Sequence, residues 1–197
     1  NELADNWSGD SSIETEEYNY SSDDVSATTD EVTETSEETA DVQPVASETT
    51  TASVSAEDAR LISEVESRKN ASAAEISALK DKIQSGQAKG TCTDGLSWNI
   101  DSNLTLTISG TGAMTDSTLP WQAYAPVVTK IVISDTVTAI STEAFLGFVA
   151  ATDVTIGKGV KVINDRAFYG CVKLASLAMN ATALTTIASG AFYDCTP

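Results

Sequence analysis

The sequence contains no histidine and few of the other residues that build reactive centres. It therefore lacks the commonest general base, the usual orienting group of a serine or cysteine triad, and the commonest metal ligand. The three cysteines, Cys92, Cys171 and Cys195, form no C-x-x-C pair, which argues against a zinc site. The segment Ser109–Ala113 has two glycines but lacks the third that a dinucleotide-binding loop needs. We predict that the protein is not an enzyme and holds no cofactor or metal.

Positive charge and long apolar runs are also scarce. The chain has 11 Lys and Arg against 29 Asp and Glu, a net charge of −18. A chain without a basic patch cannot displace counterions from nucleic-acid phosphates or bind an anionic membrane surface, so we expect neither partner. Its apolar runs are a few residues long, far short of the roughly 20 that span a membrane.

The negative charge is concentrated in residues 1–55, which hold 15 acidic residues and no Lys or Arg. Ser and Thr make up much of the remainder, and no apolar period is sustained. Because like charges repel and little apolar surface offsets chain entropy, we predict a disordered acidic tail. Such a tail is either a spacer that holds a domain away from a surface or a solvated linker without a partner.

Residues 56–89 predict a helical segment. Ser55 is a suitable N-cap, with Glu57 and Asp58 in the first turn. A heptad seam with a polar middle follows: Ile62, Val65, Lys69, Ser72, Ile76, Leu79 and Ile83. The seam predicts either a weak coiled coil that self-associates through 56–85, or a single helix or a hairpin broken near Asn70 that packs on the first coil. The polar middle favours the packed alternative, because it weakens a coiled coil.

A repeat organises residues 128–197. Ala-Phe pairs recur at spacings of 23 and 24 residues, ending at Phe145, Phe168 and Phe192. An Ile precedes each Phe by five residues, and apolar positions such as Ile131, Val154 and Leu177 keep the period. This period indicates a solenoid whose units bury their apolar faces only by stacking. We predict three coils, a ladder of short parallel strands on one face, and the extra residue of the third unit in the turn at 180–183.

Residues 90–127 predict an N-terminal cap for this solenoid. Two runs alternate apolar with polar residues around a turn at 101–103, which indicates a β-hairpin with one apolar face. Trp98 and Trp121 are expected in the core, because large aromatics on an apolar face usually bury. No similar segment follows the third unit. We therefore expect further repeats beyond Pro197, or an open C-terminal edge that self-associates.

Cys171 and Cys195 occupy the place that Phe148 fills in the first unit. Stacked coils would bring the two cysteines to about 5 Å between Cα atoms, within reach of a disulfide. However, Phe148 marks an apolar filling position, so buried free thiols are the favoured alternative.

The unit Val154–Leu174, V-T-I-G-K-G-V-K-V-I-N-D-R-A-F-Y-G-C-V-K-L, resembles the BspA-type leucine-rich repeat, whose pattern is a strand, V-x-x-I, A-F-x-x-C and then Leu. With the leading segments that start at Gly90 and Leu106, the resemblance covers about residues 90–197. The first unit departs from the pattern, with Phe148 in place of Cys and Ala151 in place of the Leu. The resemblance implies an extracellular, secreted or cell-surface bacterial protein with an adhesion or protein-binding role, and no catalytic residues.

The outward positions of the predicted ladder are the candidate ligand-binding face: Lys130, Val132, Asp153, Thr155, Ser176 and Ala178. They are small and mixed, without an aromatic anchor, so an unused solvated face is the alternative. The partner we expect is a protein, with host cell-surface and matrix proteins as candidates. The function we expect is a non-enzymatic extracellular protein-interaction or adhesion module. The alternative is a structural spacer or an accessory region of a larger surface enzyme.

Overall fold

The computed structural model describes residues 54–92, 95–115 and 119–196. The predicted acidic tail lies outside these residues except where it joins the first helix. In chain order the elements are α1 (Ala56–Lys69), α2 (Ala73–Gln84), β1 (Lys89–Thr91), β2 (Leu96–Ile100), β3 (Thr105–Gly110), β4 (Gly112–Ala113), the 3₁₀ helix η1 (Pro120–Tyr124), β5 (Lys130–Ile133), β6 (Val137–Ile140), β7 (Asp153–Ile156), β8 (Val162–Ile163), β9 (Ser176–Met179) and β10 (Thr186–Ile187).

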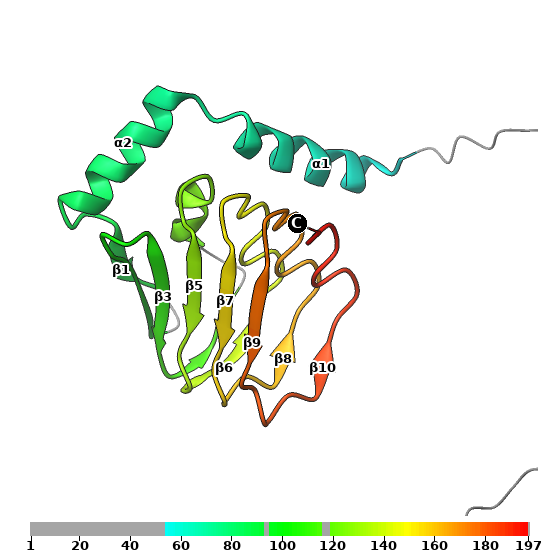
Figure 1. Cartoon of the computed structure of the whole chain (residues 1–197). Coiled ribbons are helices and arrows are strands. Elements are labelled where there is room, and N and C mark those ends of the chain that lie inside the picture. The colour runs from blue at the N-terminus through cyan, green and yellow to red at the C-terminus, as the bar shows by residue number, and fades with distance from the viewer. Residues whose placement is uncertain (1–53, 93–94, 116–118, 197) are drawn as a thin grey trace, which may run out of the picture. The chain divides into compact units, whose positions relative to one another are not determined.

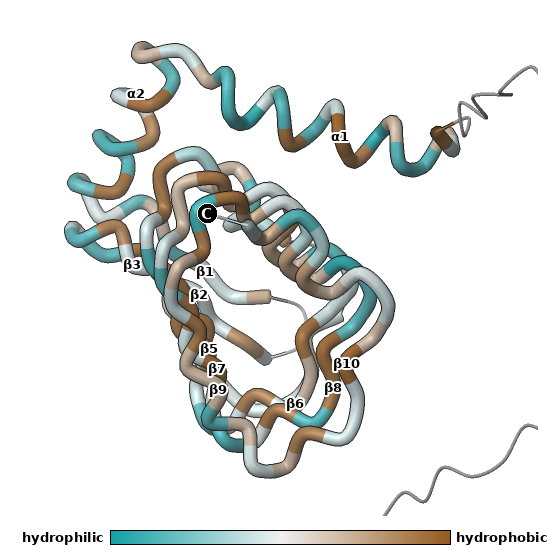
Figure 2. The backbone as a smooth tube through the Cα atoms, turned by 45° about the vertical axis from the view of Figure 1, so that its right-hand side comes forward, coloured by the Kyte–Doolittle hydropathy of each residue, from teal (hydrophilic) through white to brown (hydrophobic). Residues whose placement is uncertain are grey.

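The repeats form a β-solenoid whose coils stack in register (Figure 2). Strands β5, β7 and β9 pair in parallel, and each residue meets the one 23 positions further on, for example Ile131, Val154 and Leu177. The predicted ladder is therefore confirmed. Between β8 and β10 the offset becomes 24, with Ile163 opposite Ile187, so the extra residue of the third unit lies between β9 and β10 as predicted.

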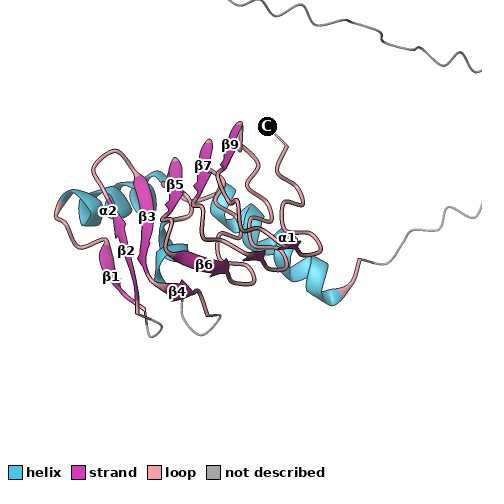
Figure 3. Ribbon diagram, turned by 90° about the horizontal axis from the view of Figure 1, so that it is seen from below, coloured by secondary structure: helices cyan, strands magenta, loops and turns pink. Residues whose placement is uncertain are grey.

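The predicted hairpin cap is also confirmed. Strands β2 and β3 pair antiparallel, and β3 then pairs in parallel with β5. The hairpin thus extends the ladder to a six-stranded sheet with the order β1-β2-β3-β5-β7-β9 (Figure 3). Strand β1 is an addition to the prediction. The turn between β2 and β3 is fixed by Asp101, whose carboxylate accepts hydrogen bonds from the backbone N–H groups of Asn103 and Thr105 at 2.9 and 3.0 Å.

A second sheet, with the order β10-β8-β6-β4, closes the coils on another side. These strands were not predicted from the sequence, because β8 and β10 contain only two residues each and cannot show an alternating pattern. Parallel pairing still satisfies their backbone groups from coil to coil.

An aromatic column fills the core between the two sheets. Phe168 stacks between Phe145 and Phe192 with ring centroids 5.0 Å apart on both sides. Trp121 continues the column at 6.1 Å from Phe145, and its indole N–H donates to the Ala144 carbonyl at 2.8 Å. Trp98 and Trp121 are both buried, as expected. The column joins cap and coils into one continuous core.

The segment before the cap forms two helices that are separated near Asn70, where one of the alternatives drawn from the sequence expected a break. Ser55 caps α1 through the Asp58 N–H, and Ser72 with Glu75 forms a capping box that starts α2. Between them the chain leaves helical geometry at Asn70, so no single heptad seam runs through 56–85. The break follows from Ser72, which offers the backbone a cap in place of a continued helix.

The two helices bury their apolar residues in different places. Leu61 and Val65 of α1 form a small cluster with side chains from the coil corners, whereas Ile83 of α2 joins the main core. Ile62, a predicted seam position, is 47% exposed while its neighbour Leu61 is fully buried. The helices therefore pack against the solenoid, with α1 running along the coils in Figure 1.

The third coil exposes several of its apolar residues. Leu177, Met179 and Ile187 are 41%, 38% and 52% exposed, whereas their counterparts in the second coil are buried.

Within the described residues, no helix combines the length and apolar character needed to cross a membrane.

Candidate functional site: the strand ladder and the helix-covered corners

The ladder face is built by strict register between strands. Pairing sets Lys130, Asp153 and Ser176 in one row. A second row holds Val132, Thr155 and Ala178. Residues between the rows point into the core, as the burial of Ile131 and Val154 shows. The six predicted residues therefore lie together on one face, at strand spacings of about 4.8 Å.

The cap extends both rows beyond the predicted residues. Thr105 pairs with Lys130, and Thr107 pairs with Val132 and with Asn99 on its other side. This extension was not predicted from the sequence, because alternation along a hairpin does not reveal the register of its parallel pairing with the next coil. The extended face carries hydroxyl, amide and methyl groups and no aromatic side chain at these positions.

Asp153 is the carboxylate of the two ladder rows. Asp153 accepts a hydrogen bond from Thr152 Oγ1 at 2.7 Å, so its carboxylate is held against the sheet. Within residues 54–92, 95–115 and 119–196, no group of three or more His, Cys, Asp or Glu residues could hold a metal ion.

A second surface lies at the coil corners, where α1 docks. Arg60 forms an ion pair with Glu143 of the first coil at 2.5 Å. Arg166 of the second coil forms one with Glu57 at 3.3 Å. In the first pair the helix supplies the positive charge, and in the second pair it supplies the negative charge. Both pairs form together only when α1 lies at one position along the corners.

Each coil corner has two residues with positive φ. The residue types at these two positions differ between the two coils that contact α1 and the third coil. The first position, just before the Ala-Phe pair, is Glu143 at φ 55°, Arg166 at 53° and Gly190 at 64°. The second, two residues after the Phe, is Gly147 at 63°, Gly170 at 70° and Asp194 at 57°. Glycine is the least strained residue at such φ values. In the two coils that contact α1, the first position instead carries the charge that pairs with the helix, and the second carries glycine.

The glycines at the second position make room for the helix. A Cβ on Gly147 would lie 2.9 Å from Arg68 Cδ, and a Cβ on Gly170 would collide with Val65 Cγ2. Burial lowers the pKa of Arg68, whose guanidinium pairs with Glu64 at 2.5 Å while its Nη1 atom has no hydrogen-bond partner. Close approach of α1 therefore has a cost in desolvation, which the ion pairs and the Leu61 and Val65 cluster offset.

Hydrogen bonds shift the ionisation of the docking charges. The hydrogen bond from Arg60 lowers the pKa of the Glu57 carboxyl, assisted by the charges of Arg60 and Arg166. Hydrogen bonds to Glu57 and Glu143 raise the pKa of Arg60. Both groups are therefore charged in the docked state at neutral pH.

Cys171 and Cys195 are free thiols, the alternative favoured from the sequence. Each thiol donates to a main-chain carbonyl of the preceding coil, Cys171 to Phe145 at 3.4 Å and Cys195 to Phe168 at 3.0 Å. The adjacent Cys195 thiol, together with burial, raises the pKa of Cys171. Cys171 is thus an inert packing residue under neutral conditions.

The coils, the in-register ladder and the phenylalanine column define a leucine-rich repeat solenoid. Residues 123–197 match the family model described as a BspA type leucine rich repeat region, in six copies. The repeat units of this region therefore match the family that they resemble in sequence, the BspA-type leucine-rich repeats. Proteins of this family are non-enzymatic repeat proteins that are typically surface-associated, and leucine-rich repeat regions generally bind proteins.

Two solved structures are similar to part of the chain. One, a leucine-rich repeat protein from Eubacterium ventriosum ATCC 27560, is 24% identical over 50% of this chain and 27% of its own, with a TM-score of 0.45. The other, a leucine rich cell surface protein from Faecalibacterium prausnitzii A2-165, is 24% identical over 54% of this chain and 34% of its own, with a TM-score of 0.35. This chain therefore matches about a third or less of each. No curated protein matches it.

Proposed function

We propose that this chain is a non-enzymatic, extracellular protein-interaction module of a bacterial surface or secreted protein, and that it acts in adhesion. The observation that carries the proposal is the ladder face. Its strands are held in register, and apart from Lys130 their side chains there are short, so a partner could approach the sheet closely over several coils. A rigid face of this kind orders few side chains on binding, which keeps the entropic cost low.

The residues proposed to contact the partner are the two predicted rows with their extension into the cap. Thr155 lies at the centre, between Val132 and Ala178. The partner proposed is a protein of the host cell surface or of the extracellular matrix. Nucleic acid is not proposed, because a net charge of −18 repels phosphate.

The proposal is tested by measuring binding of the full chain to epithelial cells, to purified matrix proteins and to bacterial cell walls. Thr155→Arg places a long charged side chain at the centre of the ladder. Thr138→Arg is the matched control, because Thr138 is half-buried in β6 of the other sheet. Saturable binding that Thr155→Arg weakens at least about tenfold and Thr138→Arg retains would support the proposal, since steric exclusion from a face of this kind costs more than about 1.4 kcal/mol.

Two other results would contradict it. Equal binding by both variants would place the interaction away from the ladder. Binding to none of the targets would favour a second candidate, a structural spacer or an accessory region of a larger surface enzyme. The second candidate is favoured by one observation: the ladder rows contain no aromatic side chain that could anchor a partner.

A further inference from the structure

The connection between α1 and α2 is short and is bent by a side-chain cap. It consists of residues 70–72, and neither it nor the two helices contain Gly or Pro. Ser72 Oγ accepts a hydrogen bond from the Glu75 N–H at 3.2 Å, and the Glu75 carboxylate accepts one from the Ser72 N–H at 2.8 Å. The backbone bond just before this cap, from the Ala71 N–H to the Arg68 carbonyl, is long at 3.4 Å. One capping box therefore maintains the bend.

A continuous helix is the alternative conformation of this connection. It would join α1 and α2 over 56–84 into one helix of roughly 43 Å. The N–H groups of residues 71–74 would then bond to main-chain carbonyls one turn earlier, in place of the capping box. Asn, Ala and Ser are all tolerated inside helices at small cost. The bent and the straight connection therefore differ in free energy by little more than the cap.

The two helices are held by different parts of the solenoid. Ile83 of α2 is buried in the main core, and Ile76 and Leu79 pack against it. Leu61 and Val65 of α1 belong to a separate cluster, which among the described residues includes no side chain of α2 or of the cap. Because α1 and α2 meet at an angle in Figure 1, straightening the connection would move α1 away from its own corners and leave α2 in the core.

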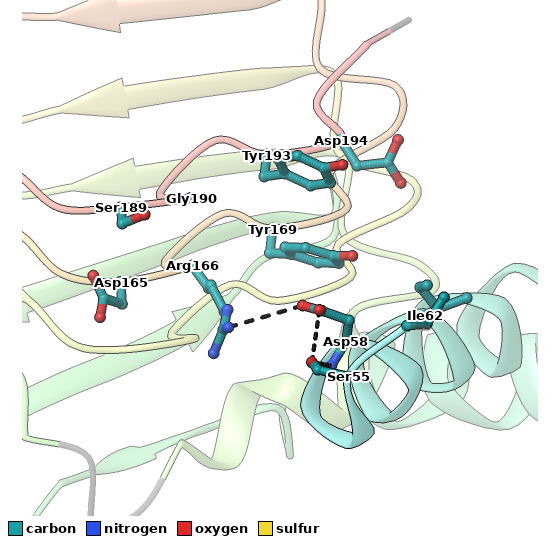
Figure 4. Close-up of a pocket in the computed structure, with 11 residues that line it drawn as sticks. Ser55, Asp58, Ile62, Asp165, Arg166, Tyr169, Ser189, Gly190, Tyr193 and Asp194 are labelled. Carbon is teal, nitrogen blue, oxygen red and sulfur yellow. Dashed lines mark hydrogen bonds and ion pairs between the residues drawn. The ribbon is translucent and has the colours of Figure 1, made fainter. Parts of the chain in front are cut away.

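The corner surface that α1 covers is complementary to this helix. Gly147 and Gly170 leave room for its side chains, Val65 among them. At the start of α1, Arg166 of the second coil reaches Asp58 at 4.0 Å (Figure 4). These contacts join α1 to the coil corners alone, so an α1 helix from a second chain would form the same contacts.

We propose that this corner surface binds the α1 helix of a second copy of the chain, so that two chains exchange helices in a reciprocal dimer. In each chain the connection at 70–72 straightens, α2 stays on its own solenoid, and α1 docks on the corners of the other chain. Dimer and monomer share the corner contacts, so the connection and the protein concentration decide between them. The inference is independent of the proposed function, because the ladder face takes no part in it.

The test changes the connection and measures the mass of the full chain by light scattering after size exclusion, over a range of concentrations. The buffer contains about 0.15 M salt, which screens repulsion between the acidic chains. Ser72→Ala removes the capping box and permits a continuous helix. Both connections of a dimer straighten, so we expect this variant to dimerise about tenfold or more tightly than the unmodified chain. Circular dichroism verifies that it folds. Dimerisation no tighter than that of the unmodified chain would overturn the proposal.

Ala73→Pro, added to Ser72→Ala, is the matched control. Proline suits the first position of a helix, and the backbone at residue 72 before it is extended, with φ −66° and ψ 156°. A continuous helix would instead lose the N–H of residue 73 and clash with the preceding turn. We expect the double variant to dimerise no more tightly than the unmodified chain. A dimer as tight as that of Ser72→Ala alone would show that straightening is not its cause, and would overturn the proposal.

The corner surface is tested by two further changes in the Ser72→Ala background. Gly170→Ala places a Cβ against Val65, so α1 can dock on neither its own nor the other chain, and the dimer should be lost. Gly190→Ala adds a Cβ at a similar φ but meets Arg166 Cγ at 3.5 Å, and the dimer should be retained. A dimer that persists or strengthens in Gly170→Ala would place the contact between the helices themselves and overturn the proposal.

Discussion

At the scale of single residues, Phe168 is the centre of the solenoid core. It is fully buried, and its ring stacks on Phe145 and Phe192 of the neighbouring coils at 5.0 Å. Each coil alone would leave this ring exposed, so the column makes the stability of one coil depend on the next.

We expect Phe168→Ala to destabilise the protein by about 3–5 kcal/mol, because it removes a ring from a closely packed column and leaves a cavity. Urea unfolding followed by circular dichroism measures this loss. Tyr193→Ala is the comparison, since that ring is largely exposed and its loss should cost far less. Similar losses for the two variants would contradict the central role of the column.

At the scale of elements, two kinds of corner residue position α1: glycines that leave space for the helix, and charged residues that form ion pairs with it. Gly147 and Gly170 let the helix approach, while Glu143 and Arg166 pair with it. The third corner has Gly190 and Asp194 at the equivalent positions and lies beyond these contacts. The corners thus define where α1 docks.

Gly170→Ala should release α1 from the coils, whereas Gly190→Ala should not. Both residues have positive φ, 70° and 64°, so both variants bear a similar backbone cost of about 1–2 kcal/mol. Only at position 170 does the new Cβ collide with Val65, while at 190 its nearest neighbour is Arg166 Cγ at 3.5 Å. Hydrogen–deuterium exchange of residues 56–69 reports the difference. Unchanged protection of α1 in Gly170→Ala would show that the helix does not depend on this slot.

At the scale of the whole molecule, docking and core respond differently to pH. The pKa of Glu57 is lowered in the folded state by its hydrogen bond with Arg60 of the same helix, and further by the charge of Arg166 on the second coil. A lowered pKa stabilises the docked state above the unfolded value, about 4.3 for Glu, and this contribution is lost as the pH falls through the folded value. The aromatic column contains no titrating side chain and should persist.

Between pH 7 and pH 3.5 we therefore expect α1 to lose hydrogen-exchange protection, after correction for intrinsic rates, before β7 does. Protonation of Glu57 removes its ion pair with Arg166 of the second coil, which weakens docking. Glu57→Gln is the check, because it should reduce α1 protection at pH 7 and make what remains less sensitive to acid. Simultaneous loss of protection in α1 and β7 would contradict separate responses.

The sequence by itself determined the solenoid, the ladder rows and the hairpin cap. These features are periodic or local: a 23-residue repeat sets the register of Lys130, Asp153 and Ser176, and alternation sets the buried side of each strand. The buried tryptophans and the free thiols followed from the same pattern of apolar positions.

Only the tertiary structure decided where α1 lies and which of its residues are buried. Leu61 and Ile62 are adjacent in α1, and either one could mark its buried face. Contact with Tyr169 and Leu146 buries Leu61 and leaves Ile62 exposed. The ion pairs that fix its register join residues 83 and 109 positions apart, a separation that no period specifies.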